Sequence, residues 1–454
     1  MTLTLKKFGR EPALRSATGG CRRIVAAPAI AAASLLAIAG CTTTQVMEPP
    51  PTTASDDAEY TTLYPYYAEI CALSQLGKKP GFGVDLGSGG IGGHAVLYLN
   101  GVCRAQDVAY PILEMCDQTA RPPTADGVGL SVNSHYKNAT WVAIEGRDFF
   151  FRGGLAPGEA LTRNTYATVQ ARATSKKIYD DVSFHDWVFE NMPPDFVRSS
   201  FKYEISVATD YAIAFARNRY CARVPLSRPQ MVKVVNFLNS QNQPYKDGKK
   251  NFEWNILTHN CSHINHNALA AADIWSEWEM DRFILISMFD FPVPKNEFVN
   301  LMRRTNDLPI DNLEAIFHDR SARALLLNEG RLPTQPGALV DLGAIVQPNE
   351  IYDTHSRIIF YDDPITGAFQ RRFDAILTQP RYFRVRDNLA YFAALYNTIK
   401  IERLPFSKYL ERHRGISMEE TRDFRLFYER YYDYIDRQIR YIGEEIAELG
   451  RKVE

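Results

Sequence analysis

The chain has no surplus of positive charge and, beyond its first 40 residues, no long apolar run. Its 454 residues include 52 Lys and Arg against 53 Asp and Glu, but residues 1–40 hold six of the basic residues and only one acidic residue. Residues 41–454 therefore carry 46 basic and 52 acidic side chains, a net charge of −6. A mildly acidic body lacks the basic surface that nucleic acids require, so we expect no nucleic-acid partner. After residue 40 no segment is apolar enough to cross a bilayer, and no internal repeat is present.

Residues 1–40 predict a signal peptide. A Lys- and Arg-containing start precedes the apolar run "IVAAPAIAAASLLAIAG", which is too short for a membrane span and ends in small residues. The following "IAGC" resembles the lipobox of bacterial lipoproteins, in which the cysteine is acylated. That resemblance implies a lipid on Cys41 and a protein held on the periplasmic side of the cell envelope. Thr42, in place of Asp, favours the outer membrane. The alternative is an ordinary secretory signal followed by a chance cysteine.

The rest of the chain divides by composition into three predicted segments. Residues 41–60 are rich in Pro, Thr and acidic residues and predict a disordered tether. Residues 61–290 are long enough for one large domain. After the two prolines of "FPVPKNEF", residues 291–454 predict a mixed, mainly helical C-terminal region. It ends in a long amphipathic helix whose apolar stripe indicates core packing, with dimerisation or a membrane-facing cover as alternatives.

Cysteine use is consistent with export. Apart from Cys21 in the leader and Cys41, five cysteines remain, and four of them could form two disulfides in three possible connectivities. One thiol is then left over, and its local chemistry favours Cys261 as that thiol. The five are Cys71, Cys103, Cys116, Cys221 and Cys261.

The segment "THNCSHINHNALAAA", residues 258–272, predicts a helix that begins beside a cysteine. Asn260 is a favourable N-cap, which places Cys261 in the first turn, where the helix dipole favours a thiolate and lowers the pKa of the thiol. The first N–H groups of such a helix could also stabilise an oxyanion. Two other interpretations are a buried, capped helix with an inert Cys261 and a zinc site. The zinc ligands would be His259, Cys261, His263 and His266; because no second ligand pair appears, we predict no metal.

A glycine-rich segment precedes the other candidate residue, His94. The formal G-x-G-x-x-G at 87–92 leads into "HAVLYL", which reads as a strand, whereas a dinucleotide site needs a helix there. We therefore predict no nucleotide cofactor. "NG" at 100–101 is typical of a hairpin turn, so His94 would begin the first strand of a hairpin. A lone strand histidine is more often structural, but beside Cys261 it could serve as a general base.

Three segments, taken in order, resemble a known fold. They are "GGHAVLYL" (92–99), "ARNRYCARVPLSRPQMVKVVNFLNSQ" (216–241) and "THNCSHINHNAL" (258–269). A strand histidine followed much later by Asn-Cys at a helix start resembles the circularly permuted NlpC-type, papain-like thiol fold, which lecithin:retinol acyltransferase relatives share. The likeness is greatest to the periplasmic domain of the lipoprotein intramolecular transacylase family. It implies an α+β fold with an antiparallel sheet and a cysteine-bearing helix over roughly residues 60–290.

The resemblance also implies the roles of individual residues. Cys261 matches the nucleophile and His94 the general base, while a third polar residue should orient the histidine from the next strand. The segment "VCRAQDVAY" offers Arg104, Gln106 and Asp107 for that role, and none matches clearly. We retain Asp107 and Asn260 as candidates for orienting or oxyanion support.

The implied chemistry is acyl transfer or hydrolysis at an ester or amide of a lipid or lipoprotein. Because "HNCSH" departs from the family's form, the acceptor stays open. Cleavage of a peptidoglycan amide is an alternative, and a non-catalytic envelope scaffold is another.

Overall fold

A computed structural model describes most of the chain after residue 40. The predicted signal peptide, residues 1–40, lies outside the described residues, as does Asp107. The described ranges are 41–44, 54–84, 93–106, 108–116, 127–256, 259–278, 293–354, 358–361, 368–413 and 415–451.

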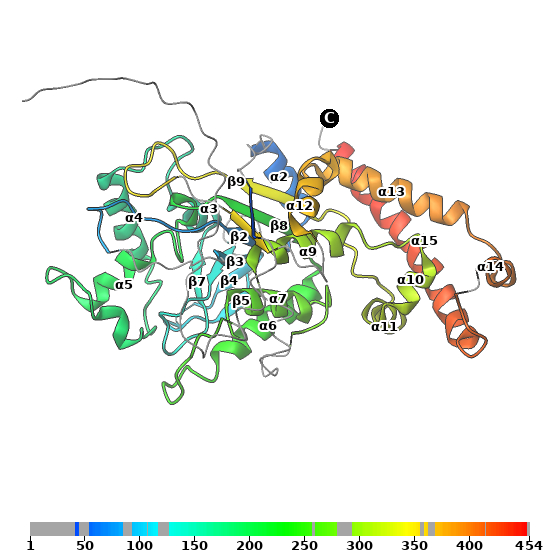
Figure 1. The fold of residues 1–454 in the computed structure, drawn as a ribbon, viewed down its shortest axis with the longest axis horizontal. Coiled ribbons are helices and arrows are strands. Elements are labelled where there is room, and N and C mark those ends of the chain that lie inside the picture. The colour runs from blue at the N-terminus through cyan, green and yellow to red at the C-terminus, as the bar shows by residue number, and fades with distance from the viewer. Residues whose placement is uncertain are drawn as a thin grey trace, which may run out of the picture. The chain divides into compact units, whose positions relative to one another are not determined.

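The fold is α+β and is built on a six-stranded antiparallel sheet, as predicted (Figure 1). The strand order is β7-β6-β3-β2-β8-β9, and every neighbouring pair is antiparallel. The central strands β2 and β3 are rich in apolar side chains and are buried along their whole length, which places the core at the middle of the sheet. The six strands are β2 Tyr67–Leu73, β3 His94–Asn100, β6 Val128–Ser131, β7 Val142–Glu145, β8 Arg219–Pro225 and β9 Leu339–Gly343.

Two short strand pairs lie outside this sheet: β1 Cys41–Thr44 with β10 Ile358–Tyr361, and β4 Val102–Arg104 with β5 Leu113–Met115. The helices and 3-10 helices are α2 Ala54–Leu63, α3 Arg147–Arg152, α4 Arg163–Ser175, η2 Asp186–Phe189, α5 Arg198–Ser206, η3 Ile213–Phe215, α6 Arg228–Asn242, α7 Cys261–Ala271, α9 Pro294–Asn306, α10 Leu313–His318, α11 Arg320–Glu329, α12 Phe369–Leu377, η4 Pro380–Tyr382, α13 Val385–Ile401, α14 Phe406–Arg412 and α15 Thr421–Arg451. Within the described ranges, no helix is both long enough and apolar enough to cross a bilayer.

The hairpin predicted at the "NG" pair is wrong. β3 pairs with β2 and β6, whereas β4, which follows the turn, pairs with β5. Gly101 has φ +79°, and a Cβ there would lie 2.5 Å from the ring of Tyr66. Glycine at this position lets the chain pass close to the Tyr66 ring as it turns away from the main sheet. The turn signal therefore marks the point where the chain leaves the six-stranded sheet for the β4–β5 pair.

The two disulfides follow one of the three possible connectivities. Cys71 and Cys221 lie directly opposite each other on β2 and β8 and are bonded, and the second disulfide joins Cys103 to Cys116. Cys261 is the free thiol, as its local sequence suggested.

Residues after 290 are not a separate unit in the structure. Residues 41–454 cluster as one compact unit, in which β9 is the edge strand of the main sheet and α9 packs against β2 and β8. The predicted C-terminal region therefore completes the sheet of the predicted thiol domain.

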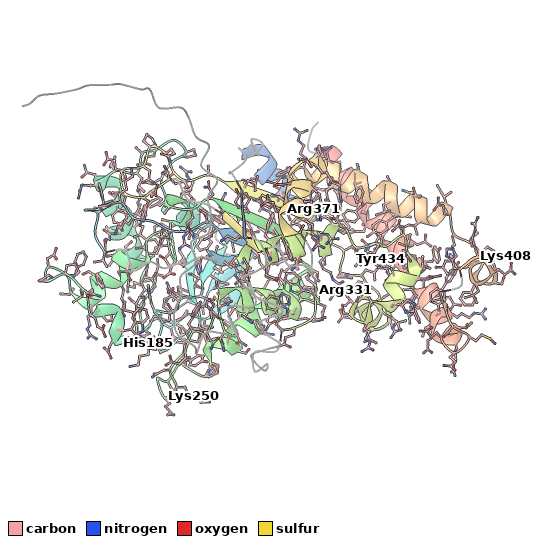
Figure 2. The ribbon with its side chains drawn as sticks, viewed as in Figure 1. His185, Lys250, Arg331, Arg371, Lys408 and Tyr434 are labelled. Carbon is pink, nitrogen blue, oxygen red and sulfur yellow. A yellow bond between two sulfur atoms is a disulfide. The ribbon has the colours of Figure 1, made fainter. Side chains whose placement is uncertain are left out.

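The long C-terminal helix is confirmed as α15, and it lies along α13 (Figure 1). Tyr434 of α15, labelled in Figure 2, lies 3.0 Å from the hydroxyl of Tyr396 on α13 and 2.8 Å from that of Thr334. Most of the apolar stripe is buried, so its main role is core packing, although Ile446 stays exposed.

The predicted tether contains more structure than expected. α2 begins at Ala54, and its Tyr60 is buried against the rings of Tyr64 and Tyr67. Cys41, the predicted lipid-attachment residue, is the first residue of β1. A disordered segment over the whole of 41–60 is therefore wrong, because aromatic side chains near its end have a core to pack against.

Candidate functional site

Cys261 begins α7, as the sequence predicted. The Asn260 side chain caps the helix by accepting hydrogen bonds from the N–H groups of Ser262 (2.8 Å) and His263 (3.2 Å). Those two donors are therefore already engaged, which weakens the expectation that the first N–H groups of the helix serve an oxyanion. Asn260 acts through the backbone of the cysteine helix as a cap.

The sulfur of Cys261 lies against the beginning of β3. The backbone N–H of Ala95, the residue after His94, approaches the sulfur, and the N–H of Ser262, which donates to Asn260, also lies close to it. Cys261 is 7% exposed, and this burial raises the pKa of its thiol, although the two N–H groups and the charge of Arg217 oppose the shift. The lowered thiol pKa expected from the helix dipole is thus wrong, because desolvation outweighs the dipole here.

His94 reaches the same place from β3. Its ring is buried, and burial, together with the charges of Arg217 and Lys295, holds its pKa well below the ordinary value, so the imidazole is neutral at pH 7. Between the described residues the ring makes one hydrogen bond, to Ser131, and no hydrogen bond joins it to the sulfur of Cys261. The structure therefore brings thiol and imidazole into one buried cluster without a direct bond between them.

A hydroxyl and a carboxylate orient the histidine. His94 Nε2 lies 3.2 Å from Ser131 Oγ, and that hydroxyl donates to Asp210 Oδ1 at 2.7 Å. Because the one hydroxyl proton of Ser131 is given to Asp210, Nε2 of His94 must carry the ring proton. Nδ1 is then the nitrogen with a lone pair, which is the form a general base requires. Asp210 is itself fixed by Asn133 Nδ2 (3.0 Å) and Tyr179 Oη (3.0 Å).

The residue that contacts the His94 ring lies on a different strand from the candidates that the sequence offered. Among the candidates on the segment after β3, the Arg104 guanidinium donates to the carbonyls of Ala109 and Lys177, and Gln106 is exposed. Asp107 lies outside the described residues. One of the two neighbours of β3 in the sheet is β6, where Ser131 is directly opposite Val96 and so faces the side of the sheet that His94 faces. The only signal in the sequence was a serine that ends an apolar strand.

Two buried basic side chains complete the cluster, and sequence reasoning missed both. Lys295, in the first turn of α9, is fully buried, and its Nζ lies beside Gly93, where a Cβ would meet it at 2.2 Å. Gly93 also has φ +72°, so only glycine suits this approach. Burial and the charge of Arg217 lower the pKa of Lys295 to about 7, while Cys261 acts in the opposite direction. Arg217 is fully buried just before β8.

The histidines that suggested zinc have other partners. The His266 ring is stacked between Trp275 (4.1 Å between centroids) and Trp278 (3.8 Å). Its Nδ1 lies 2.9 Å from Glu297 Oε2, and its Nε2 donates to the carbonyl of Ser276 at 2.8 Å. His263 Nδ1 lies 3.1 Å from the Asn260 side chain. In the described part of the chain, the ligand atoms of His259, Cys261, His263 and His266 do not converge on one point.

Comparison with known proteins adds no relative. No family model matches this chain, and neither a curated protein nor a solved structure matches it significantly. The function of this protein must therefore be inferred from the site and from the resemblance of its motifs.

Proposed function

We propose that this protein is an envelope-anchored enzyme that transfers or hydrolyses acyl groups, with Cys261 as nucleophile and His94 as general base. The preferred substrate is an acyl ester or amide of a lipid or lipoprotein. The observation that carries the proposal is the packing of α7, which begins with the buried Cys261, against β3, which begins with a neutral His94 held in a single tautomer.

The electrostatics of the cluster define how the reaction would begin. A thiol with a raised pKa and an imidazole with a lowered one do not exchange a proton at rest. The thiolate would form as Cys261 attacks the acyl carbonyl, with Nδ1 of His94 accepting the thiol proton. Loss of water from the buried site on substrate binding strengthens the stabilising contact from the Ala95 N–H.

The rest of the cycle balances with these two residues. The new C–S bond forms as the C–O or C–N bond of the substrate breaks, and the leaving group takes the proton from His94. Water or a second acceptor then attacks the thioester and gives its proton to His94, and His94 passes that proton to the departing Cys261 sulfur, which restores the thiol.

The arrangement of elements supports a permuted papain-like, NlpC-type domain. The strand that begins with His94 precedes the helix that begins with Cys261 by 167 positions, and α7 packs against β3 of an antiparallel sheet. The proposed location is the periplasmic face of the outer membrane, through a lipid on Cys41 of the "IAGC" sequence. That anchor would keep the site close to acyl lipids.

The test is to trap the acyl-enzyme. We expect the full-length protein, incubated with phospholipid vesicles whose acyl chains carry an alkyne, to acquire a label that neutral hydroxylamine removes. Peptide mass spectrometry should place the label on Cys261, and Cys261→Ala should carry none. His94→Gln should reduce labelling by at least tenfold, whereas His413→Gln, at an exposed histidine after α14, should not change it.

Two outcomes would overturn the proposal. Labelling that persists in Cys261→Ala would remove the nucleophile. Release of fragments from purified peptidoglycan, with no acyl label at any vesicle concentration, would replace the lipid substrate with a peptidoglycan amide.

Ser131 gives a second prediction. Ser131→Ala removes the hydroxyl that fixes the Nε2–H tautomer of His94, so we expect the labelling rate to fall about tenfold, the effect of one hydrogen bond of ~1.4 kcal/mol. Ser131→Thr keeps the hydroxyl and should retain most of the rate. The measurement is the pseudo-first-order labelling rate as a function of vesicle concentration. An unchanged maximal rate in Ser131→Ala would show that the tautomer is fixed by other contacts.

A further inference from the structure

Three consecutive residues at the beginning of β3 bring together groups from three elements. Gly93 contacts the Lys295 Nζ of α9, His94 supplies the imidazole, and the N–H of Ala95 approaches the Cys261 sulfur of α7. α7 and α9 also pack against each other. The amine and the thiol therefore lie beside the two residues that flank His94 in the chain, and both side chains are buried.

The charges in this cluster interact directly. The described titratable groups that face Lys295 are Cys261 of α7, His94 of β3 and Arg217 before β8. Arg217 disfavours a second positive charge on Lys295, whereas a negative sulfur favours it. A buried ammonium becomes favourable here when the thiol ionises, and the reverse also holds.

We propose that the ε-ammonium group of Lys295 is the counter-charge that stabilises the Cys261 thiolate, which makes it a third functional group of this site. The inference rests on the proposed function, in which Cys261 is the nucleophile. It adds a residue from the segment after 290 to the chemistry, and it explains how a buried thiol can ionise beside a histidine that is neutral.

The proton balance is simple. The pair begins with a thiol and an ammonium and loses one proton to solvent. What remains is either thiol plus amine or thiolate plus ammonium; the two forms contain the same atoms and differ only in which atom holds the proton. The fraction present as thiolate plus ammonium is the reactive form, and the two groups titrate as a pair.

The test is the pH profile of Cys261 alkylation by iodoacetamide, followed by peptide mass spectrometry between pH 5.5 and pH 10.5. For the wild-type protein we expect the alkylation rate of Cys261 to rise in two steps as the pH increases. The first is near pH 7, where the pair loses its first proton, and the second is at alkaline pH, where the remaining proton leaves. Lys295→Met should lose the first rise, so that its labelling rate at pH 7.5 falls at least tenfold. Lys295→Arg keeps a positive charge, so its labelling rate should rise in a single step, at a lower pH than the step in Lys295→Met.

Controls separate this role from a structural one. Lys408→Met changes an exposed lysine on α14 that pairs with Glu411, and it should keep both rises (Figure 2). Thermal unfolding of each variant establishes that the fold is retained. A wild-type profile in folded Lys295→Met would overturn the inference and leave the acyl-enzyme proposal untouched. Acyl labelling that persists in Cys261→Ala would overturn the proposed function, whatever the alkylation profile shows.

Discussion

Replacing Asp341 by alanine is expected to lower the free energy of unfolding by about 3–5 kcal/mol, the cost of breaking a buried ion pair by removing one partner. Asp341 lies on β9 and is buried, and its Oδ2 contacts the guanidinium groups of Arg147 (2.9 Å), Arg219 (3.2 Å) and Arg223 (3.3 Å). Glu69 of β2 also pairs with Arg147 and lies 3.7 Å from Arg223. Without Asp341, the buried guanidinium group of Arg223 and the partly buried ones of Arg147 and Arg219 would face the carboxylate of Glu69 alone.

The acid dependence of this effect has a definite sign. Burial alone would raise the pKa of Asp341, but the charges of Arg219, Arg223 and Arg147 outweigh it and hold that pKa well below the ordinary value. The folded state therefore binds this proton less readily than the unfolded state does. The contribution of Asp341 is fully present above about pH 4 and is lost as the pH falls further. We expect urea unfolding curves of Asp341→Ala to show a weaker dependence on pH below 4 than the wild type.

The matched control is Asp186→Ala, which breaks an exposed pair. Asp186 accepts from Arg198 at 2.8 Å, but both side chains are more than 60% exposed, so the loss of stability should be far smaller than for Asp341→Ala. A similarly small change for Asp341→Ala would mean that water or a shift of Glu69 compensates the three arginines.

Local signals in the sequence predicted the elements that carry the two central residues. An Asn cap before a run of helix-forming residues predicted the helix that starts at Cys261, and an apolar run predicted the strand that starts at His94. The apolar stripe after residue 420 predicted α15. These signals succeed because capping and amphipathic periodicity act over one or two turns of chain.

The partners of these elements could not be predicted in the same way. The pairing of β3 with β2 and β6 depends on contacts between distant segments, and the "NG" signal pointed to the wrong neighbour. Ser131 and Asp210 were missed for that reason, since they lie 37 and 116 positions from His94 in the chain. The direction of the thiol pKa shift was also wrong, because the helix dipole is visible in a sequence and the extent of burial is not.

The segment after residue 290 connects the stability of the sheet to the chemistry of the site. Through β9 it supplies Asp341 to the buried charges, and through α9 it supplies Lys295 to the thiol. A composition change at two prolines marked a boundary in the sequence, yet the fold uses both sides of that boundary for a single core.

Lys295 should destabilise the fold at neutral pH, so Lys295→Met is expected to raise the free energy of unfolding. Burial and the charge of Arg217 lower the pKa of Lys295 from 10.5 to about 7, and each pKa unit corresponds to ~1.4 kcal/mol. Between these two values the unfolded chain binds a proton that the folded protein does not, so the destabilisation diminishes as the pH rises. The gain from methionine should therefore be about 4–5 kcal/mol at pH 7 and approach zero near pH 10.5. Urea unfolding at several pH values measures this gain, with Lys408→Met as the variant that should gain no stability.

A loss of stability in Lys295→Met at pH 7 would show that the buried amine is compensated in the folded state. A gain in stability together with slower alkylation of Cys261 would mark Lys295 as a residue kept for chemistry at the expense of stability.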